Sequence, residues 1–157
     1  MKKVFRLLTL FVVVGSMVAL TSCGKDKQAQ IVGKWQFVKA SVSVSLSDPE
    51  LQEYINQFIS YQEAELNNDL ETAMFEFKSD NTFVAYYDGE AESTGNWSLE
   101  NNKLILSSIE EGESISEEFN IPTLNSSTLI MEAVESYDDE DEVITGTIST
   151  TLEFKRV

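Results

Sequence analysis

From residue 35 onward, apolar and polar residues alternate, which is the period that buries one face of a β-strand. In the first such segment, 35–46, serine occupies every second position from Ser41 to Ser45, with valine between. Trp35 and Phe37 have the opposite parity to these valines. A bulge or sharp bend at 37–39 is therefore expected, because it would turn both apolar sets inward.

Residues 47–70 break this alternation and repeat apolar side chains at the spacing of an α-helix. Two helix starts fit: Ser47 with Glu50 as a capping box, or Asp48 as N-cap with Pro49 at the first helical position. The apolar stripe consists of Leu51, Ile55, Phe58, Ile59 and Leu66.

Alternating segments return after this helix, separated by turns rich in Gly, Asn, Asp and Ser. They are residues 72–78, 82–87, 93–99, 103–109, 114–121 (ended by Pro122), 128–136 and 143–157. Short connections make sequential strands antiparallel neighbours, and eight such strands can close into a barrel without exposed edges. The prediction is all-β: an eight-stranded antiparallel up-and-down barrel with one α-helix between strands 1 and 2. A two-sheet sandwich is the alternative, although sandwiches usually need longer crossovers. The apolar stripe of the helix is expected to cover one mouth of the barrel.

The first 22 residues have the pattern of a secretory signal peptide. Three basic residues precede an apolar run of 14 residues at 7–20. That run is shorter than the roughly 20 residues that a membrane span needs. We therefore expect residues 1–22 to be cleaved.

The apolar run ends in "LTSC" at 20–23, which resembles the lipobox of bacterial lipoproteins. The resemblance implies that Cys23 becomes the first residue and carries acyl chains such as palmitate. Residues 23–30 would then be the lipidated cysteine and a short polar tether, and residues 31–157 the folded domain. An ordinary cleaved signal with an incidental cysteine is the alternative. Cys23 is the only cysteine, so the domain has no internal disulfide.

Charge narrows the set of partners. With the signal peptide removed, eight basic residues face 27 acidic ones, a net charge of −19. Such a chain repels nucleic acid and anionic lipid head groups, and it favours solubility, a cation or a basic partner. The chain has no histidine, which removes the commonest general base and transition-metal ligand.

Three motifs resemble the lipocalin-like lipoproteins of Gram-negative bacteria, in particular those of the Bacteroidetes. They are "IVGKWQF" at 31–37, "FEFKSDNTFVAYY" at 75–87 and "TGNWSLENNKLIL" at 94–106. In that group they occur in the same order, with a helix after the first. The resemblance covers residues 31–157 and implies a lipocalin-like barrel.

Two Gly-x-Trp pairs belong to these motifs, Gly33 with Trp35 and Gly95 with Trp97. Residues i and i+2 share a face of a strand, so each glycine is expected to make room for the indole. The resemblance also implies that the first-strand tryptophan closes the base of the barrel under a basic residue from the last strand. Arg156 matches that residue and has inward parity. Gly33, Trp35 and Arg156 are therefore predicted to be structural.

The barrel interior is the candidate ligand site, because its aromatic and aliphatic lining suits an apolar or amphipathic molecule. The predicted ligand-binding residues are Phe75, Phe77, Phe83, Tyr87, Leu106, Phe119, Met131 and Phe154. The same residues could instead fill a solid core. The protein would then be a structural or interaction module that contacts another envelope protein. An unfilled interior larger than roughly 300 Å³ would favour binding.

No catalytic constellation is apparent, and we expect no enzyme activity, cofactor or metal. The acidic run 138–142 lacks the spacing of a calcium-binding loop and is interpreted as a solvated hairpin. Gly24 follows the cysteine in place of the aspartate that retains some lipoproteins at the inner membrane. The expected location is the outer membrane, on either its periplasmic or its outer side.

Overall fold

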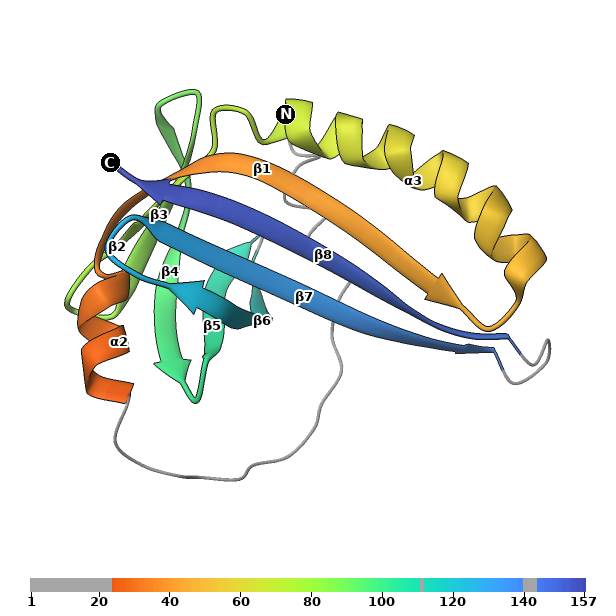
Figure 1. The fold of residues 1–157 in the computed structure, drawn as a ribbon. Coiled ribbons are helices and arrows are strands. Elements are labelled where there is room, and N and C mark those ends of the chain that lie inside the picture. The colour runs from red at the N-terminus through yellow and green to blue at the C-terminus, as the bar shows by residue number, and fades with distance from the viewer. Residues whose placement is uncertain (1–23, 111, 140–143) are drawn as a thin grey trace.

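The computed structural model describes residues 24–110, 112–139 and 144–157 (Figure 1). The signal peptide and Cys23 lie outside these residues. Eight antiparallel strands form a closed barrel in sequence order, with β8 paired to β1, so the predicted fold class is confirmed and the sandwich is excluded. The strands are β1 (Gly33–Leu46), β2 (Met74–Phe77), β3 (Thr82–Tyr87), β4 (Glu90–Glu100), β5 (Lys103–Glu110), β6 (Glu113–Leu124), β7 (Thr128–Asp139) and β8 (Ile144–Arg156). None of the helices in the described ranges has the length and apolar character needed to span a membrane.

The barrel is uneven along its axis. β1 pairs with β2 only over Gly33–Gln36, whereas it pairs with β8 from Trp35 to Leu46. β6 and β7 likewise pair only between Asn120 and Leu124 on the β6 side. Strands β7, β8 and β1 therefore continue as a long ribbon past the end of the shorter strands (Figure 1). We call the closed end, where β1 meets β2 and β6 meets β7, the base, and the opposite end the mouth.

Two irregularities in the strands matter for the interior. The register of β1 against β8 shifts between Phe37 and Lys39, which confirms the predicted bulge and places Phe37 and Ala40 in the core. β6 was expected to end before Pro122, but it continues to Leu124. A register shift between Asn120 and Thr123 accommodates the proline, because a bulge does not require its missing N–H.

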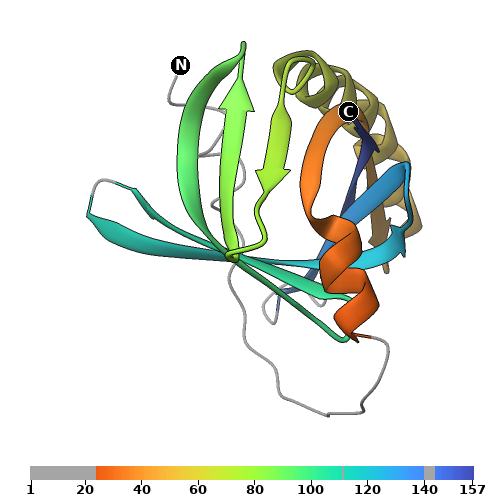
Figure 2. The same ribbon diagram turned by 90° about the vertical axis from the view of Figure 1, so that its left-hand side faces the viewer.

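Helix α3 (Pro49–Asp69) begins in the second of the two predicted ways, with Asp48 as its N-cap. The Asp48 carboxylate accepts hydrogen bonds from the N–H groups of Glu50 and Leu51, and Pro49 occupies the first turn. Ser47 instead accepts a hydrogen bond from the Thr145 N–H. α3 runs alongside β1 (Figures 1 and 2) rather than across the end of the barrel.

The residues expected to be a tether form helix α2 (Gly24–Ile31), which packs against the base (Figure 2). Lys27 Nζ donates to Asn102 Oδ1 at 2.6 Å, and Gln28 Nε2 donates to the Leu99 carbonyl at 3.2 Å. Ile31 is fully buried. The segment is helical because this anchor residue and these contacts give an otherwise polar sequence a surface on which to fold.

The most tightly packed part of the core lies at the base. Its fully buried side chains are Ile31, Trp35, Phe77, Leu104, Ile121 and Leu129. Toward the mouth, the inward residues of the ribbon are only partly buried, as Val42 and Val44 are. The base therefore provides most of the apolar burial, and the mouth holds the open space.

Candidate functional site

Arg156 and Trp35 close the base as predicted. The Arg156 guanidinium carbon lies 4.4 Å from the centroid of the Trp35 ring. Arg156 also donates to the carbonyls of Val32, at 2.9 Å, and Gln30. Trp35 Nε1 donates to the Ile31 carbonyl at 2.7 Å. The pair thus binds three consecutive carbonyls at the C-terminal end of α2, where a positive charge is favoured.

The glycines of the Gly-x-Trp pairs have a different role from the one expected. Gly33 has φ +136°, and a Cβ there would lie 2.5 Å from Arg156 Nη1. A Cβ at Gly95 would lie 2.7 Å from the Phe83 ring and would collide with the backbone of Ser107. The expectation that each glycine makes room for its own indole is therefore wrong. Gly33 accommodates the guanidinium, and Gly95 accommodates a ring from β3 and the neighbouring strand β5.

Trp97 belongs to the base and not to a ligand site. Its ring meets that of Phe77 edge-on, with centroids 5.8 Å apart, and its Nε1 donates to the Lys78 carbonyl at 3.1 Å. Phe77 is 1% exposed. These two side chains seal the barrel below the cavities described next.

An inner cavity of about 100 Å³ lies in the barrel above the base. All but one of the predicted ligand-binding residues line it, the exception being Phe77, which packs below. The predicted residues on its wall are Phe75, Phe83, Tyr87, Leu106, Phe119, Met131 and Phe154. The structure therefore brings them together around a space smaller than the 300 Å³ that small-molecule sites usually exceed.

An outer cavity of about 400 Å³ lies at the mouth, between α3, the β1–β8 ribbon and β6. Four residues line both cavities, so the two adjoin: Leu70, Glu117, Phe119 and Leu152. Sequence reasoning missed this space. The outer cavity lies between two apolar surfaces, the stripe of α3 and the valines of β1. Both surfaces are visible in the sequence, but nothing in the sequence shows that they face each other.

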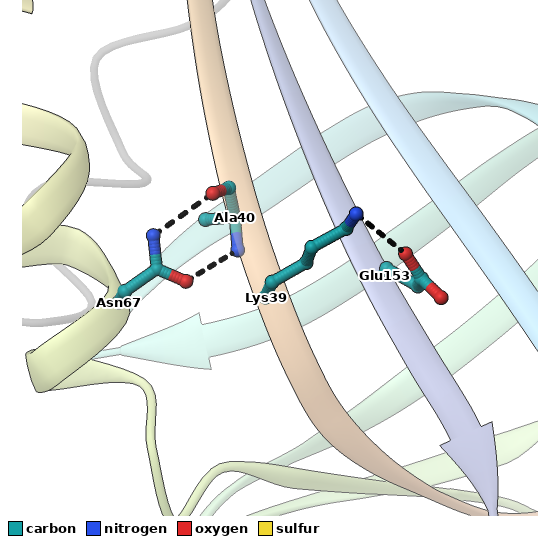
Figure 3. A network of polar contacts seen from close by, with 4 residues as sticks. All are labelled: Lys39, Ala40, Asn67 and Glu153. Carbon is teal, nitrogen blue, oxygen red and sulfur yellow. Dashed lines mark hydrogen bonds and ion pairs between the residues drawn. The ribbon is translucent and has the colours of Figure 1, made fainter. Parts of the chain in front are cut away.

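Helix α3 forms the outer wall by covering the free edge of β1. Beyond Gln36, β1 has no β2 partner, so its N–H and C=O groups on that edge need others. Asn67 is the hydrogen-bond partner of both backbone groups of Ala40 (Figure 3). Its Oδ1 accepts from the Ala40 N–H at 2.7 Å, and its Nδ2 donates to the Ala40 carbonyl at 2.8 Å. On the other edge of β1, Lys39 pairs with Glu153 of β8 at 3.4 Å (Figure 3).

Two further side chains of α3 continue this edge. Glu63 Oε2 accepts from the Val42 N–H at 3.0 Å. Gln52 Oε1 accepts from the Leu46 N–H at 2.7 Å, and its Nε2 donates to the Val44 carbonyl at 2.8 Å. The helix therefore replaces a missing strand with side-chain amides and a carboxylate.

Charged groups in the cavity walls are carboxylates. Glu92 and Glu117 line the inner cavity, and Asp69, Glu117 and Glu118 line the outer one. Nearby on β7, Glu135 shares a face with Ala133, and burial raises the pKa of its carboxyl above the ordinary value. Across the described ranges, no three acidic or sulfur-bearing residues cluster as metal ligands would. The acidic run 138–142 lies largely outside those ranges.

The fold and the cavities define a class, an up-and-down β-barrel that encloses apolar space next to a helical wall. The model of the lipocalin-like domain family matches residues 31–131, which is more than half of the chain, and the chain belongs to that family. A solved structure of a DUF4847 family protein from Bacteroides vulgatus ATCC 8482 is similar, with 11% identity and a TM-score of 0.44. That match covers 83% of this chain and 96% of the other. No curated protein matches the sequence significantly.

Proposed function

We propose that the chain is a lipid-anchored binding protein of the bacterial cell envelope, whose barrel holds a small apolar or amphipathic molecule. The two adjoining cavities carry this proposal. The outer cavity, about 400 Å³, has the size of a small-molecule site, and the inner one extends it toward the aromatic residues. The lipocalin-like fold supports the same role.

The proposed role is binding without catalysis. The chain has no histidine, and its only cysteine, Cys23, is assigned to lipid attachment. The lipobox-like "LTSC" supports acylation of Cys23, and Gly24 after it supports the outer membrane as the location. Several acyl chains on one residue would give a stable anchor.

A cavity-filling substitution tests the binding proposal. The purified protein is titrated with the neutral fluorescent probe N-phenyl-1-naphthylamine, and saturable binding is expected. Ala133 lines the outer cavity, so Ala133→Phe should weaken binding by tenfold or more, because the added ring occupies the same space. Ala64→Phe is the matched control, since Ala64 lies on the exposed face of α3.

Circular dichroism melting establishes that both variants fold. The proposal is overturned when the wild type shows no saturable probe binding. It is equally overturned when a folded Ala133→Phe variant binds the probe as well as the Ala64→Phe variant does.

A second candidate, an interaction module, is favoured by an exposed stripe on α3. Leu51, Tyr54, Phe58 and Tyr61 recur three or four residues apart and are 37%, 73%, 55% and 65% exposed. Single exposed apolar residues need no explanation, but an aligned group can mark a contact surface. α3 carries five acidic residues and no basic one, so the fitting partner is an amphipathic basic segment.

A model peptide tests this second candidate. A helical peptide of leucine and lysine should bind the purified protein, measured by fluorescence anisotropy, and the double variant Tyr54→Ser, Tyr61→Ser should bind it more weakly. Equal binding by the variant, or equal binding of a leucine–glutamate peptide, would count against the candidate.

A further inference from the structure

We propose that the ligand is an unbranched apolar chain with a polar head, bound with the end of the chain in the inner cavity and the head in the outer one. This inference rests on the proposed function, because it specifies the shape and the orientation of the molecule held in the same two cavities. It follows from the sizes of the cavities, from the side chains that they share and from the packing of the inner wall.

The inner cavity is too small for a ring. Its volume is about 100 Å³, whereas a buried apolar cavity that holds one benzene molecule measures about 150 Å³. A methylene chain is slimmer than a benzene ring, so the end of a chain can enter where a ring cannot. The outer cavity, at about 400 Å³, has room for either shape. The inner cavity therefore distinguishes an unbranched chain end from a ring.

Apolar side chains line the way from one cavity to the other. Of the four residues that line both cavities, three are apolar and buried: Leu70, Phe119 and Leu152. The fourth, Glu117, is partly buried. A chain that extends from the outer cavity into the inner one can therefore stay against apolar side chains along its length.

The end of the chain is better sheltered from water in the inner cavity. On its wall, Phe83, Met131 and Phe154 are at most 2% exposed. In the outer cavity, Val42 is only partly buried and Phe58 is exposed. Stabilisation by apolar groups grows with the surface removed from water, so the apolar end gains more in the inner cavity. The polar head then lies in the outer cavity, which is nearer to solvent.

Contacts between aromatic rings stiffen the inner wall. Phe75 lies next to Phe154 and Phe83, with ring centroids 5.6 Å and 6.2 Å away, and Phe154 meets Phe37 edge-on at 5.8 Å. All four rings line the inner cavity. Each of them can move only by losing contacts with its neighbours, because protein interiors are close-packed. The wall is therefore not expected to widen enough to admit a ring.

Two neutral alcohols with the same number of carbons test the inference: dodecan-1-ol, which ends in a chain, and 6-phenylhexan-1-ol, which ends in a ring. Each displaces N-phenyl-1-naphthylamine from the purified protein. Ala85 lines only the inner cavity, and Ala85→Ile fills about three methylenes' worth of that space. This variant should weaken dodecanol by about tenfold or more, because each methylene that loses its place costs about fourfold. Binding of 6-phenylhexanol should change by less than twofold.

The matched control is Ala91→Ile, which makes the same substitution at an exposed position on the neighbouring strand β4, outside both cavities. It should leave both alcohols unaffected. A second variant, Leu106→Ala, enlarges the inner cavity alone. It should tighten 6-phenylhexanol by about fivefold or more, because the enlarged space approaches the size that holds benzene. Circular dichroism melting establishes which variants fold.

Three results overturn the inference and leave the binding proposal standing. In the first, folded Ala85→Ile weakens the two alcohols equally or leaves dodecanol unaffected. In the second, Ala91→Ile weakens dodecanol as much as Ala85→Ile does. In the third, folded Leu106→Ala binds 6-phenylhexanol no better than the wild type. Failure of the neutral probe itself to bind overturns the proposed function and the inference together.

Discussion

At the residue scale, Arg156 links three parts of the base that are far apart in the sequence. Its guanidinium stacks on Trp35, occupies the space left by Gly33 and binds the last carbonyls of α2. The family resemblance and side-chain parity together predicted that Arg156 points into the barrel. The carbonyl contacts could not be predicted, because nothing in the polar segment 24–30 indicates that it folds back onto the base as a helix.

Arg156→Ala should lower the free energy of unfolding by about 2–3 kcal/mol, from the lost stacking and the carbonyls left without donors. Urea unfolding measures this loss. Affinity for N-phenyl-1-naphthylamine should stay unchanged, because Arg156 lines neither cavity. Lys155→Ala, at the exposed neighbouring position, is the control. A melting temperature equal to that of the control would contradict the role given to Arg156.

Glu135 should make stability depend on pH. Burial raises the pKa of its carboxyl in the folded protein, so the folded state disfavours the ionised form. Below the ordinary pKa of 4.5, Glu135 is protonated and the folded state bears no penalty from it. As the pH rises through the higher pKa of the folded protein, the carboxyl ionises and the folded state loses stability. Glu135→Gln should therefore raise the melting temperature at pH 7 and have little effect near pH 4.

Glu53→Gln on the exposed face of α3 removes the same charge and is the comparison for that experiment. If both variants stabilise equally at pH 7, relief of the overall negative charge explains the effect and the burial of Glu135 does not.

At the scale of elements, α3 is held to the barrel by polar contacts more than by burial. No residue of the helix is fully buried, yet Gln52, Glu63 and Asn67 together bind five backbone groups along β1. A covered edge is protected from pairing with another chain. The helix thus both lines the outer cavity and prevents β1 from acting as an open edge.

Asn67→Leu should cost about 1–3 kcal/mol, because it leaves the N–H and the C=O of Ala40 without their partner. Urea unfolding measures the lost free energy of unfolding. Faster hydrogen exchange of the Ala40 amide shows that the loss arises at this contact. Asn68→Leu, at the adjacent exposed position, should change neither quantity. Unchanged exchange at Ala40 in the Asn67 variant would show that water replaces the amide at no cost.

The order of the strands and of helix α3 was predictable from the hydrophobic periodicity and the turn residues. The predictions that were wrong have local physical causes. Alternation in 35–46 predicted β1 and its bulge, because side-chain parity is visible in the sequence. Pro122 predicts the end of a strand, and this prediction is wrong because the strand has a register shift at the proline, which composition does not reveal. Helix α2 was not predicted because seven of its eight residues are polar or small, and its one large apolar residue is the buried Ile31. Side-chain parity predicted seven residues of the inner cavity wall, on strands from β2 to β8. The outer cavity could not be predicted in this way, because it depends on where α3 lies.

At the scale of the whole molecule, stability and open space are separated along the barrel axis. The fully buried side chains concentrate at the base, and the larger cavity lies at the mouth. Local opening of a protein follows the regions with least buried apolar surface. The wall of the mouth is therefore expected to open without unfolding the base.

Native-state hydrogen exchange measures this difference. Amides of α3 should exchange through local opening, at a free energy below that of global unfolding. Amides of β4 and β5 around Trp97 and Leu104 should require global unfolding. A single exchange free energy shared by α3 and these strands would contradict the separation.

The docking of α2 would determine how the protein, if anchored as proposed, is oriented on a membrane. Helix α2 begins at Gly24 and lies against the base, so the chain leaves no slack between the barrel and the residue before it. With acyl chains on Cys23, as proposed, the lipid would hold the base next to the bilayer. The mouth, the outer cavity and α3 would then face away from the membrane. Ligand would arrive from the aqueous side and not by sliding out of the leaflet that holds the anchor.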